Sequence, residues 1–233
     1  MAITLNQVSN EKLRADLARA LKTYENVPDK GHGSEHIEQV VNMAQRLAAS
    51  SGRKVNPDHL LAAGVLHDIA REHERVTGED HALAGVRMAP EYLGGVNPAG
   101  QRAILHAIGE HRSTTGNPKT RLAKILADAD RLPDIADRDI MFRRFVQYRR
   151  ARGVSDAQIP SNSLEYMRNW YPRVSAEFNT PEAKKIVGES KDYWTGLMND
   201  PVKWEEAFQP YLVEKTSAYE LGCRIALEQC MAR

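Results

Sequence analysis

Apolar residues recur at helical spacing along almost the whole chain. Between residues 11 and 25, for example, Leu13, Leu17 and Leu21 fall on one stripe of a helix. The apolar positions of residues 34–49 repeat in the same way, every three or four residues. We find no stretch with the strict alternation that is typical of a half-buried β-strand. The pattern therefore predicts an all-α protein.

One segment stands out because it is apolar on most sides. Asn56-Pro57 provides a cap and a first-turn proline, and the apolar run that follows stops at His67-Asp68. We therefore expect a central buried helix that ends at this pair. The charged residues after it, 71–80, predict a loop, and Pro133 is expected to end or kink the helix over 120–132.

The amino-acid composition of the chain changes beyond about residue 135. Residues 138–152 are rich in basic and aromatic side chains, 153–163 predict a loop, and the rest predicts three or four further helices. We predict a helical core over residues 1–140 and a C-terminal helical extension over 141–233 that packs on the core. The three tryptophans of this last part are interpreted as core or interface anchors: Trp170, Trp194 and Trp204.

Composition narrows the class of protein. The 233 residues suit one large domain or a domain with an extension, and a net charge of +1 provides no general attraction to nucleic acid or membrane. No apolar run approaches the roughly 20 residues that span a bilayer, and the N-terminus lacks the apolar region of a signal peptide. Cys223 and Cys230 lie too far apart on one helix for a disulfide. We expect a cytoplasmic protein.

Six histidine and aspartate residues fall at predicted helix ends or edges. Imidazoles and carboxylates together suit Mn, Fe, Co, Ni or Zn, and Mg if water fills several positions. One helix cannot present so many ligands to one ion, so they must converge from several helices. A buried aspartate next to a histidine also needs a counter-charge, which a cation supplies. The six are His36, His67, Asp68, His81, His111 and Asp130.

The segments that carry these residues resemble the HD superfamily of metal-dependent phosphohydrolases. The resemblance covers roughly residues 25–195 and is carried by HGSEHIEQVVNMA, LAAGVLHDIARE, HALAGVRMA, AILHAIGEHR and ILADADRLPDI. It implies an all-α HD-domain helical bundle with additional C-terminal helices, and a divalent metal ion held by four residues: His36, His67, Asp68 and Asp130.

Within the superfamily, the chain looks most like small bacterial predicted HD hydrolases with a DADRL-type motif, which are implicated in nucleoside triphosphate pyrophosphohydrolysis. Asp130 is preferred to Asp128 as the last ligand because the family motif, alanine, aspartate, Arg or Lys, leucine, matches Ala129–Leu132. Asp128 stays open as a rival or as a partner of a ligand. The chain departs from this branch at Gly33 and Pro133. The resemblance therefore says more about the fold of the protein than about its substrate.

The number of metal ions stays open at this point. His81 and His111 match positions where two-metal HD proteins carry extra histidines, so the site would hold one or two ions. In a one-metal site, His111 would instead bind substrate or act as a general acid.

The sequence contains further candidate site residues besides these six. Glu72 follows the His-Asp pair and would activate water, or be a solvated loop charge. His32 is a candidate phosphate ligand or helix cap, while Arg112 and Arg131 would bind phosphate oxygens or form surface salt bridges. We thus expect Asp68, His111, Glu72 and Arg131 to be catalytic, and substrate to be bound by His32, Arg112 and Arg131. The arginines of 143–152 line a phosphate entry path or form a solvated helix face.

These features predict hydrolysis of a phosphoester or phosphoanhydride bond in a nucleotide-like small molecule by metal-activated water. Two other classes stay open: a di-iron oxygenase on the HD fold, and a non-catalytic nucleotide-binding HD module. We expect a small phosphorylated substrate as partner, no membrane, no stable nucleic-acid partner, and leave room for a homodimer.

Overall fold

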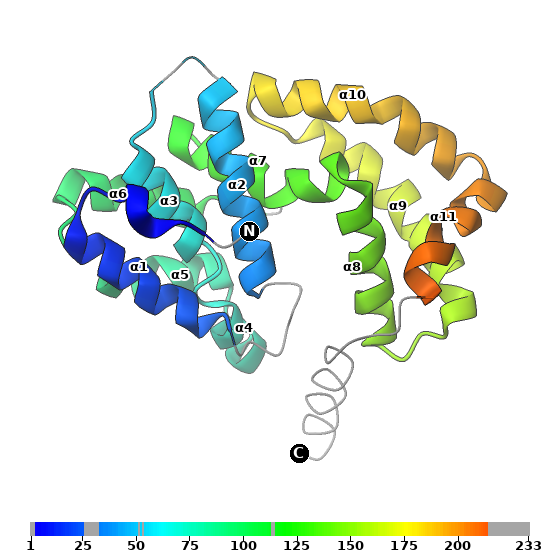
Figure 1. Ribbon diagram of the computed structural model, residues 1–233, viewed down its shortest axis with the longest axis horizontal. Coiled ribbons are helices and arrows are strands. Elements are labelled where there is room, and N and C mark those ends of the chain that lie inside the picture. The colour runs from blue at the N-terminus through cyan, green and yellow to red at the C-terminus, as the bar shows by residue number, and fades with distance from the viewer. Residues whose placement is uncertain (1–2, 26–32, 51, 53, 113–114, 214–233) are drawn as a thin grey trace. The chain divides into compact units, whose positions relative to one another are not determined.

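The computed structural model describes residues 3–25, 33–50, 52, 54–112 and 115–213. Within these ranges the regular secondary structure is entirely helical, which confirms the predicted all-α class (Figure 1). The candidate ligand His32 and the cysteines Cys223 and Cys230 lie outside the described residues.

Contacts divide the chain into two units, and each is described by itself. Unit 1 consists of the described residues of Met1–Leu132 together with Phe178–Ala183. It contains the 3-10 helices η1 (Leu5–Gln7) and η3 (Ala89–Tyr92), and the helices α1 (Glu11–Thr23), α2 (Ser34–Ser50), α3 (Pro57–Leu66), α4 (Arg71–Thr77), α5 (His81–Met88) and α6 (Pro98–Gly109), which Figure 1 labels.

Helix α7 (Arg121–Ala136) begins in unit 1 and passes the boundary between Leu132 and Pro133. Unit 2 consists of the described residues of Pro133–Glu177 and Lys184–Arg233. It contains α8 (Arg138–Arg150), the 3-10 helix η4 (Asp156–Gln158), α9 (Ile159–Ala176), α11 (Pro201–Val213) and most of α10 (Pro181–Met198). The division thus falls eight residues before the boundary at 140 that the sequence suggested. The chain returns to unit 1 for the six residues Phe178–Ala183, of which the last three are the first residues of α10.

Helix α3 is the central buried helix that the sequence predicted. The side chain of Asn56 caps it by accepting from the backbone N–H groups of Asp58 and His59, and all residues from Leu60 to Leu66 are buried. Gly64 lets α3 approach α2 closely, because a Cβ at this position would lie 2.9 Å from Val41 Cγ2. This close approach sets how near the ends of α2 and α3 can bring their side chains.

Residues 71–77 form helix α4, so the prediction of a loop over 71–80 was wrong for most of its length. The segment REHERVT has no apolar stripe, and its stabilising contacts are ion pairs one turn apart, Arg71 with Glu74 and Glu72 with Arg75. Gly78, with a φ of 76°, ends the helix in the left-handed conformation and donates its N–H to the Glu74 carbonyl. Apolar periodicity cannot detect a helix of this kind.

Helix α7 continues three residues past Pro133, so the proline does not end it. Proline lacks the N–H that would bond to the Ala129 carbonyl, and the cost is confined to that one turn. The helix ends instead at Asp137, whose side chain accepts from the N–H groups of Asp139 and Ile140 and so starts α8.

The core of unit 2 is aromatic. Trp194 and Trp204 are fully buried, and their indole N–H groups donate to the carbonyls of Ile135 and Pro160 at 2.9 and 2.8 Å. Phe142 packs edge-on to Phe208, with ring centroids 4.8 Å apart. These two tryptophans are therefore core anchors, as expected, whereas Trp170 is half-buried and stacks on Tyr166.

The basic residues of α8 are engaged within unit 2. Arg144 pairs with Asp134 at 2.7 Å, and Arg150 pairs with Asp156 at 2.8 Å. The guanidinium group of Arg138 lies over the ring of Tyr193. These contacts fit a helix face built into unit 2 better than an open phosphate path.

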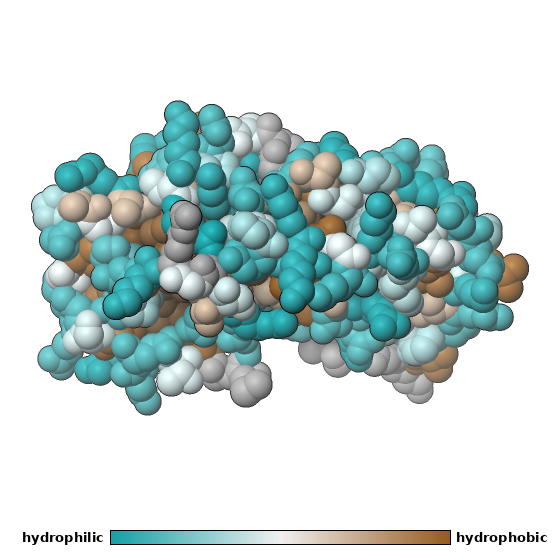
Figure 2. Space-filling view, turned by 90° about the horizontal axis from the view of Figure 1, so that it is seen from above, coloured by the Kyte–Doolittle hydropathy of each residue, from teal (hydrophilic) through white to brown (hydrophobic). Residues whose placement is uncertain are grey.

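The molecular face in Figure 2 is mostly hydrophilic, with small separate groups of apolar side chains. No helix among the described residues is long and apolar enough to cross a bilayer.

Candidate metal centre

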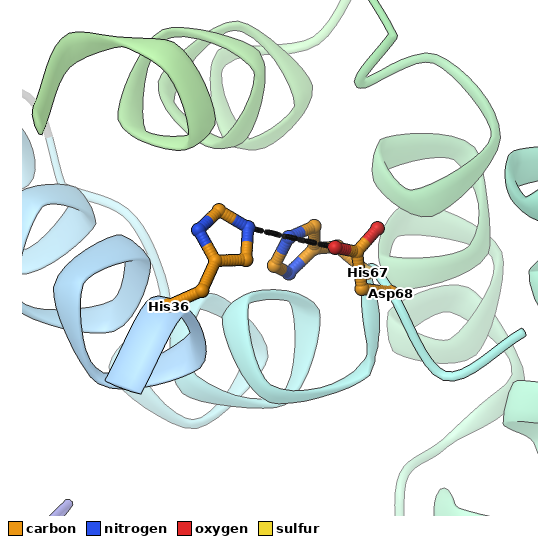
Figure 3. Close-up of side chains that lie close together, drawn as sticks. All are labelled: His36, His67 and Asp68. Atoms are coloured by element: carbon orange, nitrogen blue, oxygen red, sulfur yellow. Dashed lines mark hydrogen bonds and ion pairs between the residues drawn. The ribbon is translucent and has the colours of Figure 1, made fainter. Parts of the chain in front are cut away.

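The six predicted ligands converge in unit 1. Figure 3 shows three of them, with the ring of His36 directed at the carboxylate of Asp68, beside His67. His36 lies in the first turn of α2, His67 follows the last residue of α3, and Asp68 lies in the turn that leads to α4. Adjacent side chains diverge on a continuous helix, so the end of α3 at Leu66 allows His67 and Asp68 to face one site.

The other three come from separate elements. His81 is the first residue of α5, held by the cap residue Asp80, which accepts from the N–H groups of Ala82 and Leu83. His111 follows the end of α6, and Asp130 lies within α7. Five of the six side chains are buried, and Asp130 is 19% exposed. Asp130 is therefore the most exposed member of the cluster.

The first group consists of His36, His67, Asp68 and Asp130. His36 Nε2 lies 3.2 Å from His67 Nε2, 3.5 Å from Asp68 Oδ2 and 3.2 Å from Asp130 Oδ1. His67 Nε2 lies 3.5 Å from Asp68 Oδ2 and 3.6 Å from Asp130 Oδ1. Two imidazole nitrogens and two carboxylate oxygens thus enclose one small space.

The second group consists of Asp68, His81 and His111, and it uses the other oxygen of Asp68. His81 Nε2 lies 3.1 Å from His111 Nε2 and 3.3 Å from Asp68 Oδ1, and His111 Nε2 lies 3.8 Å from the same oxygen. Asp68 therefore joins the two groups, with Oδ2 in the first and Oδ1 in the second.

Hydrogen bonds at the outer nitrogens fix the orientation of three rings. His67 Nδ1 donates to the Gly64 carbonyl at 2.8 Å, and His111 Nδ1 donates to the Ile108 carbonyl at 2.6 Å. His81 Nδ1 donates to Oε2 of Glu74 at 2.8 Å. A neutral imidazole whose Nδ1 carries the proton presents a lone pair at Nε2. Each of these rings is thus prepared to bind a cation with the nitrogen that faces the cluster.

This arrangement fits a divalent metal ion. In the first group, the Nε2 atoms of His36 and His67 lie 3.2 Å apart, and both lie within 3.6 Å of carboxylate oxygens of Asp68 and Asp130, so donor atoms of four residues face one point. Metal–ligand bonds of about 2.1 Å place neighbouring ligand atoms about 3.0–3.5 Å apart in octahedral or tetrahedral geometry. The separations within both groups are close to this range. The donor set, nitrogen and carboxylate oxygen, suits a borderline transition metal.

The pKa values of the cluster follow from burial and from its carboxylates. Burial would lower the pKa of His67, but Asp68 and Asp130 outweigh it and raise this pKa. For His111, burial and the neighbouring ring of His67 lower the pKa to about 4. Burial would raise the pKa of Asp130, but hydrogen bonds with His36 and His67 hold it well below its usual value. Near pH 7 His111 is therefore neutral and Asp130 is ionised, the forms that bind a metal.

Two residues that the sequence did not single out border the cluster. Arg71 Nε donates to Asp68 Oδ1 at 3.0 Å, and its Nη1 donates to Glu74 Oε2 at 3.0 Å. Glu74 thereby accepts from Arg71 and His81 with the same oxygen, and its other oxygen lies 3.3 Å from Arg112. Burial would raise the pKa of Glu74, but His81 and the two arginines lower it. Arg71 and Glu74 follow Asp68 by three and six residues, and on a helix such steps of three residues place side chains beside one another. The charged residues of this segment predicted a loop, so this spacing was not used.

The structure separates the two aspartates of α7 that the sequence left as rivals. Asp130 faces His36 and His67, whereas the buried carboxylate of Asp128 accepts the backbone N–H groups of Asn179 and Thr180 at 2.8 and 2.7 Å. Asp128 thus holds the returning segment Phe178–Ala183 within unit 1. This geometry favours Asp130 as the ligand.

Three other candidates lie as follows. Arg131 donates to the Ala127 carbonyl and lies over the ring of Phe178, so these contacts do not bring it to the imidazoles. Glu72 pairs with Arg75 on the exposed side of α4. Arg112 pairs with Asp80 at 2.5 Å and borders the cluster through Glu74. The catalytic roles of Glu72 and Arg131 stay predictions.

Comparison with known proteins identifies a family for the segment that carries the cluster. Residues 33–133 match the family model described as the HD domain. Residues 33–133 form an HD domain. The match extends over all six residues of the cluster, and the helical fold is the one that the resemblance implied. A search of curated proteins finds no match.

Solved structures share this fold. A predicted HD superfamily hydrolase from an uncultured Thermotogales bacterium has a TM-score of 0.56 and 23% identity, over 84% of this chain and 96% of its own. A Lactobacillus plantarum protein has a TM-score of 0.56 and 22% identity over 83% and 96%. YpgQ of Bacillus subtilis, crystallised in complex with ADP, has a TM-score of 0.56 and 17% identity over 81% and 94%. At these identities the likeness concerns the fold.

Proposed function

We propose that this HD-domain protein is a metal-dependent phosphohydrolase that cleaves a phosphoester or phosphoanhydride bond of a nucleotide-like small molecule. The observation that carries the proposal is the first group, in which the Nε2 atoms of His36 and His67 face the carboxylates of Asp68 and Asp130. We propose these four residues as the ligands of one divalent ion.

A bound divalent cation would supply a water of lowered pKa and polarise a phosphoryl oxygen. The residues of the chain determine access to this ion and the protonation state of the groups around it. Asp130 is the most exposed of the six residues, and we propose that substrate and water reach the cluster at this edge. With a pKa of about 4, His111 is neutral near pH 7 and suits a hydrogen-bond acceptor or metal ligand better than a general acid.

Positive charge beside the cluster supports a phosphorylated substrate. The guanidinium groups of Arg71 and Arg112 lie on either side of Glu74, and both side chains are partly exposed, at 25% and 30%. Guanidinium groups match phosphate oxygens in geometry and offset charge that develops on them. The ADP complex of YpgQ, a protein of the same fold, supports a nucleotide as the substrate class.

The test is a hydrolysis screen of the full chain over nucleoside mono-, di- and triphosphates with Mn²⁺, Co²⁺, Ni²⁺ or Mg²⁺, read by product identity. We expect release of phosphate, pyrophosphate or nucleoside, loss of this activity in Asp68→Asn, and retention in Arg75→Gln. Arg75 lies on α4 but pairs with Glu72, away from the cluster. Absence of every product from the folded, metal-loaded protein would contradict the proposal.

The second group, Asp68, His81 and His111, keeps one other function open. Seven ligand positions shared between two irons are compatible with a di-iron oxygenase on the HD fold. Two irons per chain together with oxygen consumption would favour that function. Stoichiometric nucleotide binding without turnover would favour a non-catalytic binding module.

A further inference from the structure

The two groups of the cluster differ in their charged neighbours, because the guanidinium group of Arg71 lies at the rim of the second group. Oδ1 of Asp68, the oxygen of the second group, accepts from Arg71 Nε at 3.0 Å. Oδ2, the oxygen of the first group, faces His36 and His67 at 3.5 Å each. Arg71 thus binds the oxygen that a cation between His81 and His111 would need.

The charges around the second group also oppose a second cation. A divalent ion in the first group is offset by Asp68 and Asp130. Among the described residues, Glu74 contacts the second group through His81 and is then offset by Arg71, while Arg112, which borders Glu74, is offset by Asp80. No further carboxylate among these contacts remains to offset two more positive charges, and a fixed guanidinium a few ångströms away repels them.

Arg71 is held in this position from both ends. Its Nη1 donates to Glu74 Oε2, the same oxygen that fixes His81 Nδ1, so the arginine and the imidazole share one carboxylate. The side chain is 25% exposed, and its pairing with the fully buried carboxylate of Asp68 is only weakly screened. Movement of Arg71 away from Asp68 would break two charge-assisted hydrogen bonds at once.

We propose that Arg71 restricts this centre to one divalent ion by occupying the Asp68 oxygen of the second group, and leaves His81 and His111 without a metal. The inference rests on the proposed function, because it assumes that the first group binds a metal. Arg71 acts here as a residue that sets metal stoichiometry, and its removal converts a one-metal centre into a two-metal centre.

The test measures metal content directly. The full chain is stripped with a chelator, dialysed against increasing Mn²⁺, and analysed for bound manganese and for the EPR signal of a spin-coupled manganese pair. We expect one ion in the wild type and in the control Arg75→Gln. We expect two in Arg71→Gln, with the second binding at least about tenfold more tightly than any second ion in the wild type. Arg71→Lys, which keeps the charge, should retain one.

Further variants locate the second ion and replace a variant that does not fold. Arg71→Met keeps much of the aliphatic stem and replaces Arg71→Gln if circular dichroism shows that the latter is unfolded. Adding His81→Ala to either variant should return the content to one ion. Two ions in the wild type, or one ion in both folded charge-removing variants, would overturn the inference and leave the proposed function standing. No bound ion in the wild type would overturn both.

Discussion

Asp128 and Asp130 lie two residues apart on α7, yet their carboxylates serve different parts of unit 1. Asp130 Oδ1 lies 3.2 Å from His36 Nε2 in the cluster, while Asp128 accepts three N–H groups from Asn179 and Thr180. Positions i and i+2 point to different sides of a helix. One helix turn thus carries a candidate metal ligand and the anchor of the returning segment.

This relationship predicts opposite effects of two matched substitutions. Asp128→Asn should lower the free energy of unfolding by about 2–3 kcal/mol, because an amide cannot accept on both sides and leaves a buried N–H without its partner. Asp130→Asn should instead weaken Mn²⁺ binding at least about 100-fold. Urea unfolding and metal titration measure the two effects. Equal loss of metal binding in both variants would contradict the division of roles.

The low pKa of His111 predicts a pH dependence in the metal-free protein. Its pKa is about 4 in the folded chain, against 6.5 for an ordinary histidine, so between these values the unfolded chain binds more protons. Stability from this residue is complete above pH 6.5 and is lost as the pH falls toward 4. From pH 6.5 to 4.5 the wild type should lose about 2 kcal/mol more than His111→Gln.

The comparison with His111→Gln is needed because the pKa of His67 is raised and acts in the opposite sense. Its contribution is present at low pH, is lost as the pH rises through its folded value, and is common to both proteins. Urea unfolding at pH 6.5, 5.5 and 4.5 measures the difference. Parallel curves for the two proteins would show that His111 does not titrate as the geometry implies.

Glu74 should act as a positioning residue for His81, whereas Glu72 should not. In Glu74→Gln an amide replaces the carboxylate that orients His81 and Arg71, and both of these contact the proposed ligand Asp68. We therefore expect kcat to fall about 10- to 100-fold with KM and the melting temperature nearly unchanged. Glu72→Gln should keep kcat within about twofold, since Glu72 pairs with Arg75. The reverse result would restore the sequence-based hypothesis that Glu72 is catalytic.

Gly64 should resist substitution. In Gly64→Ala the new methyl group would lie 2.9 Å from Val41 Cγ2 and force α2 and α3 apart, at a cost of about 1–3 kcal/mol. Gly188→Ala on the exposed side of α10 is the matched control. A Cβ there has no neighbour within 4 Å, so alanine should stabilise by about 0.5–1 kcal/mol. Differential scanning calorimetry of both variants measures these effects, and equal shifts would refute the close approach.

The sequence predicted those features that depend on local pattern. Apolar periodicity indicated the helical class and the buried helix α3, and residue type and order indicated the six members of the cluster. Helix α4 was missed because ion pairs stabilise it in place of an apolar face. With it, the sequence also missed Arg71 and Glu74. The anchoring role of Asp128 depends on Asn179 and Thr180, far along the chain, and no local pattern reports such a contact.

The most direct test of the metal centre is the anomalous scattering of a crystal of the full chain grown with Mn²⁺. The arrangement of His36, His67, Asp68 and Asp130 predicts a single strong peak within about 2.3 Å of ligand atoms from these four residues. Absence of a peak among them, with manganese present in the crystal, would contradict the metal centre and the function proposed from it.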